Sequence, residues 1–257
     1  MLINSVIIIL REALEAALTI SVLLAISQTF NIPRQRLIPS ILLGVSLASF
    51  YAVNLAVVSD LYDGTGQELL NTALYVLIFS FILALIITIN YPAKGFLLLA
   101  MSGCMTTALI REGAEVIIYI KGFWQVTELL PTVINGSIIG TGIGFSIGVF
   151  FYYFIVTLSH NNGLRVALAM LILIASAMMS QAVQQLIQAD LVFSQAPLWD
   201  SSTWISEQSV IGQLLYALIG YEATPTPIQV YVYLFSLTVT GIVSMITLKK
   251  YQQDIDS

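Results

Sequence analysis

The chain has 257 residues, of which 58% are hydrophobic and 9% are charged, and its formal net charge at pH 7 is −5. Because soluble domains carry about 25% charged residues, this composition excludes a soluble globular protein and indicates an integral membrane protein. The apolar runs reach about 20 residues, the length that a helix needs to cross a bilayer core, whereas a transmembrane β-barrel would show short alternating segments. We therefore expect an all-α polytopic protein surrounded by membrane lipid, with no nucleic-acid partner.

Seven transmembrane helices are predicted, at residues 2–28, 38–58, 69–90, 96–120, 134–158, 164–189 and 227–248. The first lacks the basic flank of a cleavable signal peptide, so we expect it to remain in the protein. Alternate loops are basic, and they contain Arg34, Arg36, Lys94, His160, Arg165, Lys249 and Lys250. The other loops are acidic, apart from Lys121. The positive-inside rule then puts the N-terminus outside and the C-terminus in the cytoplasm, in a multi-pass protein of the inner membrane.

The segment 191–226 is predicted to be a long outer loop before the last helix. It contains the apolar stretch "SVIGQLLYALIGY", residues 209–221, which is too short to span a bilayer. We expect a re-entrant or surface-lying helix there, which either caps the outer face or helps to admit a substrate. No linker divides the chain, so residues 1–257 are expected to form a single transmembrane domain.

Two charged motifs interrupt the most apolar surroundings. Residues 6–20 read "VIIILREALEAALTI" and residues 106–120 read "TTALIREGAEVIIYI", so Arg-Glu-x-x-Glu occurs twice, 100 positions apart. The first and fourth predicted helices run in opposite directions. This predicts an inverted repeat, with residues 1–92 as repeat one, 93–190 as repeat two and the helix at 227–248 added. Inverted repeats are common in secondary transporters, which bind substrate where the halves meet.

The chemistry of the motifs points to a cation. At a rise of 1.5 Å per residue both motifs lie about 15 Å below the outer helix ends, and each charge there costs about 2.5–3.5 kcal/mol in lipid, so the charges are expected to face one another or water. The charged set is Arg11, Glu12, Glu15, Arg111, Glu112 and Glu115, with a net charge of −2. Proton uptake or a bound cation would neutralise it. Carboxylates favour hard ions such as Ca²⁺, Mg²⁺, Mn²⁺ or Fe³⁺; a clamp of ion pairs without a ligand is the structural alternative.

The segments "REALE" and "REGAE", residues 11–15 and 111–115, resemble the motifs of the oxidase-dependent iron permeases of fungi and bacteria. The outer segment "IGQLLYALIGYEATPTPIQV", residues 211–230, is similar to the region before that family's last helix. The resemblance implies a high-affinity permease that imports ferric iron, with Fe³⁺ as the transported ion, no organic cofactor and no enzymatic activity. It implies Glu12, Glu15, Glu112 and Glu115 as metal ligands, supported by Arg11 and Arg111. It also implies an outer-face partner that oxidises or delivers iron.

One departure from the family concerns the third predicted helix. Many relatives enter that helix with Glu-x-x-Glu-Gly, whereas "QELLNTA" at residues 67–73 keeps Glu68 but has Asn71 and Thr72. An acidic relay at that place is therefore not expected. Two other functions stay open: a transporter of another hard divalent cation, and a metal-binding membrane sensor or scaffold that does not transport.

Two further patterns bear on packing and on access. Glycines at every fourth position of the fifth helix allow close helix approach, either inside the molecule or in a homo-oligomer; they are Gly136, Gly140, Gly144 and Gly148. Glutamines gather at the outer end of the sixth helix, where they either line a hydrated vestibule or mark the headgroup region; they are Gln181, Gln184, Gln185 and Gln188.

Overall fold

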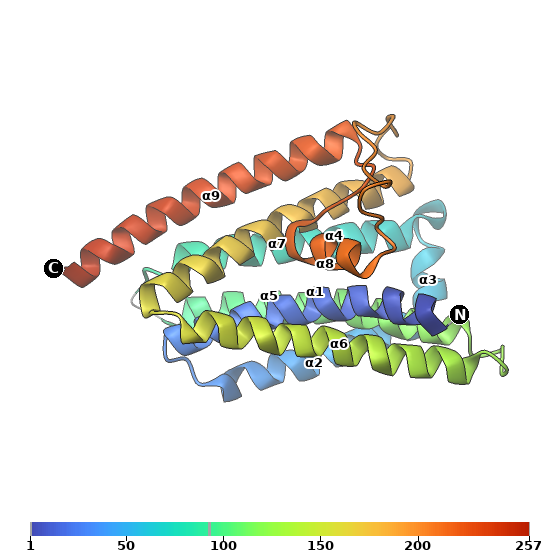
Figure 1. The fold of residues 1–257 in the computed structure, drawn as a ribbon, viewed down its shortest axis with the longest axis horizontal. Coiled ribbons are helices and arrows are strands. Elements are labelled where there is room, and N and C mark those ends of the chain that lie inside the picture. The colour runs from blue at the N-terminus through green and yellow to red at the C-terminus, as the bar shows by residue number, and fades with distance from the viewer. Residues whose placement is uncertain (1, 92–93, 257) are drawn as a thin grey trace.

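The computed structural model describes residues 2–91 and 94–256, and 81% of the chain is helical, with no strand in the described part. The long helices form one elongated bundle (Figure 1). They are α1 (Leu2–Thr29), α2 (Ile38–Val53), α4 (Gly66–Thr88), α5 (Lys94–Gly122), α6 (Leu130–Thr157), α7 (His160–Gln188) and α9 (Pro227–Asp256). Short elements join them: η1 (Arg34–Leu37), α3 (Leu55–Ser59), η2 (Tyr62–Gly64) and α8 (Val210–Ile219). The all-α prediction is confirmed.

Five helices are long and apolar enough to cross a membrane, judged by length and composition over the described residues. They cover Arg34–Val53, Gly66–Thr88, Leu130–Thr157, His160–Gln188 and Pro227–Gln253. The other two long helices, α1 and α5, have 28 and 29 residues and carry the two charged motifs. Both are long enough to span a bilayer, but each carries charged residues within its apolar sequence and is not among the five apolar helices. The count of seven spans therefore stays a prediction.

Two predicted helix boundaries differ from the structure by more than four residues. The second predicted helix, 38–58, is broken at Asn54, whose side-chain amide donates to the Phe50 carbonyl oxygen at 2.8 Å, and the chain resumes as α3. Such a local side-chain bond to the backbone competes with helix propagation. The last helix continues to Asp256 rather than ending at residue 248, because the polar residues that follow include neither proline nor glycine to stop it.

The long helices pack in three close pairs: α1 with α6, α2 with α5, and α4 with α7. The α1–α6 pair depends on the glycine ladder of α6. A Cβ atom at Gly144 would lie 2.8 Å from the Ala13 Cβ atom, and one at Gly148 would lie 2.7 Å from the Ala17 Cβ atom. Since real Cβ atoms cannot approach so closely, these positions must stay glycine for the two backbones to meet. The ladder is therefore used for packing inside the molecule.

The predicted short helix in the long loop exists as α8. It begins after Ser209, whose hydroxyl oxygen accepts a hydrogen bond from the Gly212 amide at 3.0 Å, and it ends at Gly220, which has φ 68°. The left-handed conformation at Gly220 is the usual helix stop that glycine allows. One face of α8 is buried against α1 and α7 (Figure 1). The helix thus forms part of the bundle core, beside the first charged motif.

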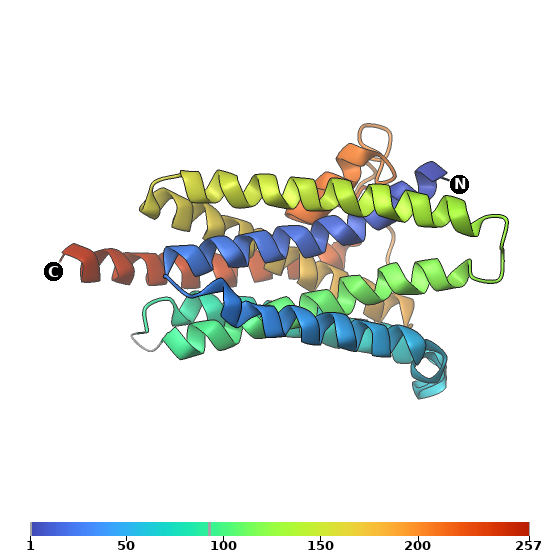
Figure 2. The ribbon, with the colours of Figure 1, turned by 90° about the horizontal axis from the view of Figure 1, so that it is seen from below.

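The two termini lie at opposite ends of the bundle (Figures 1 and 2). Two basic residues make contacts at the C-terminal end: the Lys94 ammonium donates to the Phe30 carbonyl oxygen at 2.9 Å, and the His160 ring is 2.9 Å from the Tyr251 hydroxyl. Termini at opposite ends of the bundle are expected for an odd number of membrane-spanning helices. Which end faces the cytoplasm stays a prediction from the charge pattern.

Candidate functional site

The two Arg-Glu-x-x-Glu motifs meet inside the bundle. The first motif (Arg11, Glu12 and Glu15) lies on α1, the second motif (Arg111, Glu112 and Glu115) lies on α5, and these helices are in contact. The Arg111 guanidinium donates from Nη1 to Glu12 Oε2 at 3.1 Å, across 99 positions of sequence. The prediction that both motifs reach one level of the bundle agrees with this contact.

Arg111 is the centre of the cluster. Its Nη1 atom also donates to Glu112 Oε2 at 3.0 Å and lies 3.9 Å from Glu115 Oε1. Its Nε atom donates to the Tyr75 hydroxyl at 2.9 Å, and its Nη2 atom donates to the same oxygen. The residue is 4% exposed. One buried guanidinium therefore contacts three carboxylates from two helices and a tyrosine from a third.

Arg11, at the equivalent place in the first motif, is bound differently. Its Nε atom donates to Glu15 Oε1 at 3.5 Å, and its side chain is 32% exposed. Its guanidinium carbon lies 3.8 Å from the centroid of the Tyr216 ring on α8, a cation–π contact. The short helix of the long loop thus covers the first motif directly.

The charge balance of the cluster is incomplete. Two arginines face four glutamates, which leaves −2 when all are ionised. Among the described residues, however, no group of three or more His, Cys, Asp or Glu side chains is arranged to hold a metal ion. Glu12 and Glu112 both direct a carboxylate oxygen to the same guanidinium nitrogen, so Arg111 occupies the point where these two carboxylates converge. The ligand roles of the four glutamates therefore stay predictions.

Several residues of the site were missed by the sequence patterns. Asn71 of α4 donates from Nδ2 to Glu115 Oε1 at 3.4 Å, and its Oδ1 atom accepts from the Tyr51 hydroxyl at 3.3 Å. Asn71 is 2% exposed, so this chain from α2 through α4 to α5 is buried. Asn71 stands where many members of the family that the chain resembles have glutamate, and this difference could have identified it as a residue of the site. Tyr75 is one helical turn further along α4, on the same face, and that spacing could have marked it too.

Gln181 of α7 is a further polar residue at the cluster. It is 2% exposed and neighbours the Glu15 carboxyl group. Of the four glutamines predicted to line a vestibule or to mark the headgroups, this one lies deepest, and Gln184 and Gln185 are half-buried above it. Gln181 therefore belongs to the site itself.

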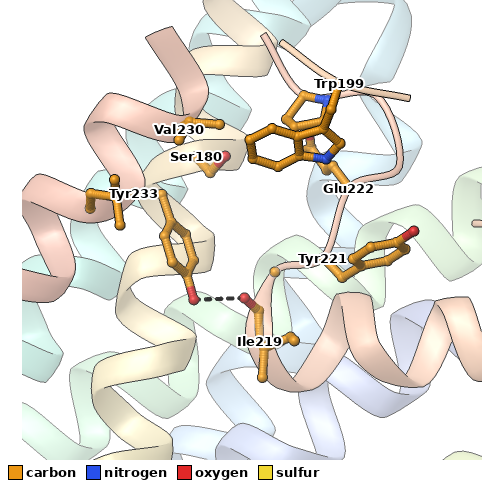
Figure 3. A pocket seen from close by; sticks show the side chains of 10 residues that line it. Ser180, Trp199, Ile219, Tyr221, Glu222, Val230 and Tyr233 are labelled. Carbon is orange, nitrogen blue, oxygen red and sulfur yellow. Dashed lines mark hydrogen bonds between the residues drawn. The ribbon is translucent and has the colours of Figure 1, made fainter. Parts of the chain in front are cut away.

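A separate pocket lies between the long loop, α7 and α9 (Figure 3). It has a volume of about 280 Å³, and Trp199, Tyr221 and Tyr233 contribute to its mainly apolar wall. Its carboxylate, Glu222, accepts a hydrogen bond from Gln229 Nε2 at 2.7 Å. Burial, and secondarily the nearby Glu207 carboxylate, raise the pKa of Glu222 to about 7. A single carboxylate in an apolar pocket is a poor site for a hard cation, which prefers several oxygen ligands.

Comparison with known proteins identifies the relationship. The model of the iron permease FTR1 family matches residues 93–251, more than half of the chain. The chain belongs to this family. The matched region contains the second motif, α8 and α9, while the first motif of the permease lies before it. No curated protein and no solved structure matches the permease. The family is one of transporters rather than enzymes, and with its apolar helices the permease is a multi-pass membrane protein that functions in iron transport.

Proposed function

We propose that the permease imports ferric iron across the inner membrane through a carboxylate site formed by its two motifs. The observation that carries this proposal is the contact of Arg111 with Glu12 and Glu112, which draws acidic side chains from two helices into one buried cluster. A cluster with more carboxylates than cations, away from water, is stable when another cation or protons complete it. Carboxylate oxygens suit a hard ion, and membership of the iron permease family favours iron.

The proposed architecture has seven spans, an inverted repeat of three plus three, and α9 as the added helix. The packing pairs support it. In an inverted repeat, α1 corresponds to α5, α2 to α6 and α4 to α7. This correspondence relates the α1–α6 pair to the α5–α2 pair, and it relates the α4–α7 pair to itself. The proposed border between the repeats, at residues 92 and 93, lies outside the described residues. The N-terminus is proposed to face outward and the C-terminus to face the cytoplasm.

Arg111 gives the site a closed state. While its guanidinium holds Glu12 and Glu112, these carboxylates are neutralised and a trivalent ion next to it would be repelled. Import therefore requires Arg111 to withdraw as the ion binds, and to return as the ion leaves toward the cytoplasm. An exchange of glutamate partners by Arg11 and Arg111 would keep uncompensated charge low in both states.

An outer-face protein that oxidises or delivers iron is proposed as the partner of the permease. Ferric iron is scarcely free in solution, so handing it directly to the acidic cluster would avoid its hydrolysis. Transport of ferrous iron or of another hard divalent cation, and metal binding without transport, are the outcomes against which the proposal is tested.

The test is uptake by proteoliposomes that contain the purified permease. Radioiron is offered as ferric citrate or as ferrous ion under ascorbate, in parallel with Mn²⁺ and Ca²⁺. The variants Glu12→Gln and Glu112→Gln are expected to lose at least about ten-fold in uptake, since each removes one charged ligand. Glu128→Gln is the matched control, because that carboxylate is exposed in a loop. Accumulation of Mn²⁺ or Ca²⁺ instead of iron, or iron binding without accumulation, would contradict ferric import.

A further inference from the structure

Three buried polar atoms at the site make no hydrogen bond of full geometry within the described part of the chain. They are Glu15 Oε2 and both atoms of the Gln181 amide, Oε1 and Nε2. Glu15 is 3% exposed and Gln181 is 2% exposed, so water in bulk does not reach them. The two residues neighbour each other where α1 packs against α7. The site therefore has unused bonding capacity at one place.

That capacity is costly to leave unused. A buried donor or acceptor without a partner costs about 1–3 kcal/mol, and native proteins hold few such groups, so each requires an explanation. Glu15 Oε1 is engaged by Arg11 at 3.5 Å, which leaves Oε2 directed elsewhere. The Arg111 part of the cluster, in contrast, uses both of its terminal nitrogens and Nε.

The two motifs differ in the hydrogen bonding of the carboxamide beside their second glutamate. The second glutamate of each motif has a carboxamide beside it: Asn71 of α4 beside Glu115, and Gln181 of α7 beside Glu15. Asn71 uses both of its amide atoms, since Nδ2 donates to Glu115 and Oδ1 accepts from Tyr51. Gln181 is less fully bonded: its Nε2 atom faces the Glu15 carboxyl group as a weak donor, and its Oε1 atom has no donor among the described residues. Both atoms of the Asn71 amide are bonded, whereas the oxygen of the Gln181 amide is left to bind another group.

We propose that Glu15 Oε2 and Gln181 Oε1 bind the transported cation inside the bundle, with Gln181 as a ligand. This inference rests on the proposed function, because it assigns a further binding residue to the same site. Both atoms are hard oxygen ligands of the kind that Fe³⁺ and other hard ions take. Binding here leaves Glu12 and Glu112 on Arg111 until the ion arrives, so the buried negative charge is never exposed without a partner. The Gln181 Nε2 group then donates to a water molecule that the ion retains.

For Gln181→Leu, the inference predicts that stability is kept while cation binding is weakened. Removing one unpartnered buried oxygen and one weak donor should leave the stability of the permease close to that of the wild type. Removing a ligand should weaken cation binding by about 10- to 100-fold, the range seen when groups around a metal site are lost. Asn90→Leu is the control for binding: its Oδ1 atom is also buried without a partner, its Nδ2 atom donates to the Thr247 carbonyl oxygen at 2.8 Å, and it follows α4 at the end opposite Asn71.

Binding is measured on purified permease with Tb³⁺, a hard trivalent probe whose luminescence nearby tyrosines sensitise, and with ferric citrate in competition. Tyr75 and Tyr216 lie at the cluster and serve as donors. Thermal unfolding of the same samples reports stability. Gln181→Glu adds a carboxylate at the same length and is expected to bind Tb³⁺ more tightly than the wild type and to slow iron release in uptake assays.

Each result decides a separate point. Wild-type affinity in Gln181→Leu overturns the inference, while a wild-type permease that neither binds nor accumulates iron overturns the proposed function. Should Gln181→Leu fail to fold, Gln181→Met decides, because the thioether keeps the length of the side chain without a hard oxygen, and wild-type Tb³⁺ affinity in that variant would overturn the inference. Equal weakening in Asn90→Leu would also count against a role specific to Gln181.

Discussion

Replacement of Arg111 by leucine tests the central feature of the cluster. Arg111 is 4% exposed and donates to Glu12 at 3.1 Å and to Glu112 at 3.0 Å. Hydrogen bonds to charged groups contribute about 1.5–3 kcal/mol each. Removing one partner of a buried ion pair costs about 3–5 kcal/mol, because the other charge is left buried and unpaired. We therefore expect Arg111→Leu to lower the free energy of unfolding by about 3–5 kcal/mol.

The first motif supplies the matched control. Arg11 occupies the equivalent sequence position, but its single carboxylate contact is 3.5 Å long and its side chain is 32% exposed. Its partner Glu15 is 3% exposed, so removing Arg11 leaves one buried carboxylate that loses a single long contact, at a cost of about 1–3 kcal/mol. Arg11→Leu should therefore cost about 1–3 kcal/mol, less than the Arg111 variant, which leaves two carboxylates and the Tyr75 hydroxyl without their partner.

The assay is reversible unfolding of the purified permease in mixed detergent micelles, which gives free-energy differences directly. Adding Glu112→Gln to Arg111→Leu should recover about 1–3 kcal/mol, since the coupled carboxylate no longer needs a counter-charge. Equal costs for Arg11→Leu and Arg111→Leu would refute the unequal roles assigned to the two arginines. A double variant no more stable than Arg111→Leu alone would refute the ion pair as the source of the cost.

Three further predictions concern the surroundings of the site. Gly144→Val should destabilise the permease by about 1–3 kcal/mol through overpacking, because a Cβ there meets Ala13, whereas Gly142→Ala, with nothing within 4 Å of its Cβ, should be neutral in thermal unfolding. Tyr216→Phe should retain wild-type stability and iron uptake, while Tyr216→Ala should lower both, since the ring contacts Arg11 and fills the α1–α8 interface; equal behaviour of the two variants in unfolding would contradict a role for the ring. The raised pKa of Glu222 means that the folded protein holds a proton to about pH 7 that the unfolded chain releases near 4.5, so stability should fall as pH rises between these values. Glu222→Gln should flatten that part of the pH profile in thermal unfolding, and an unchanged slope would show that another group is responsible.

Much of the fold was predictable because it depends on local patterns. Hydropathy marked the long helices, and their observed bounds differ from the predicted ones by only a few residues except at Asn54 and after residue 248. The four-residue spacing of glycines in α6 predicted close packing, since such spacing places small residues on one helix face. The apolar stretch at 209–221 predicted a short helix, but the sequence did not say that it packs against α1.

The site was predictable in membership but not in arrangement. The repeated motif identified its six charged residues, because charge in an apolar helix needs a functional or structural partner. It did not indicate that Arg111 bridges both motifs while Arg11 turns to Tyr216, nor that Asn71 and Gln181 complete the cluster. Because the two motifs have the same pattern, the sequence predicted the same contacts for both. The neighbouring helices give Arg11 and Arg111 different contacts.

The sequence by itself determined that this is a helical membrane protein with acidic groups in two of its apolar helices, because hydrophobicity and spacing along one chain are sufficient to establish both. Only the tertiary structure decided which carboxylate each guanidinium contacts and which polar atoms are left without a partner. Those choices depend on how helices distant in sequence face one another, since hydrogen bonds and ion pairs act over a few ångströms and require the partners to be brought together by packing.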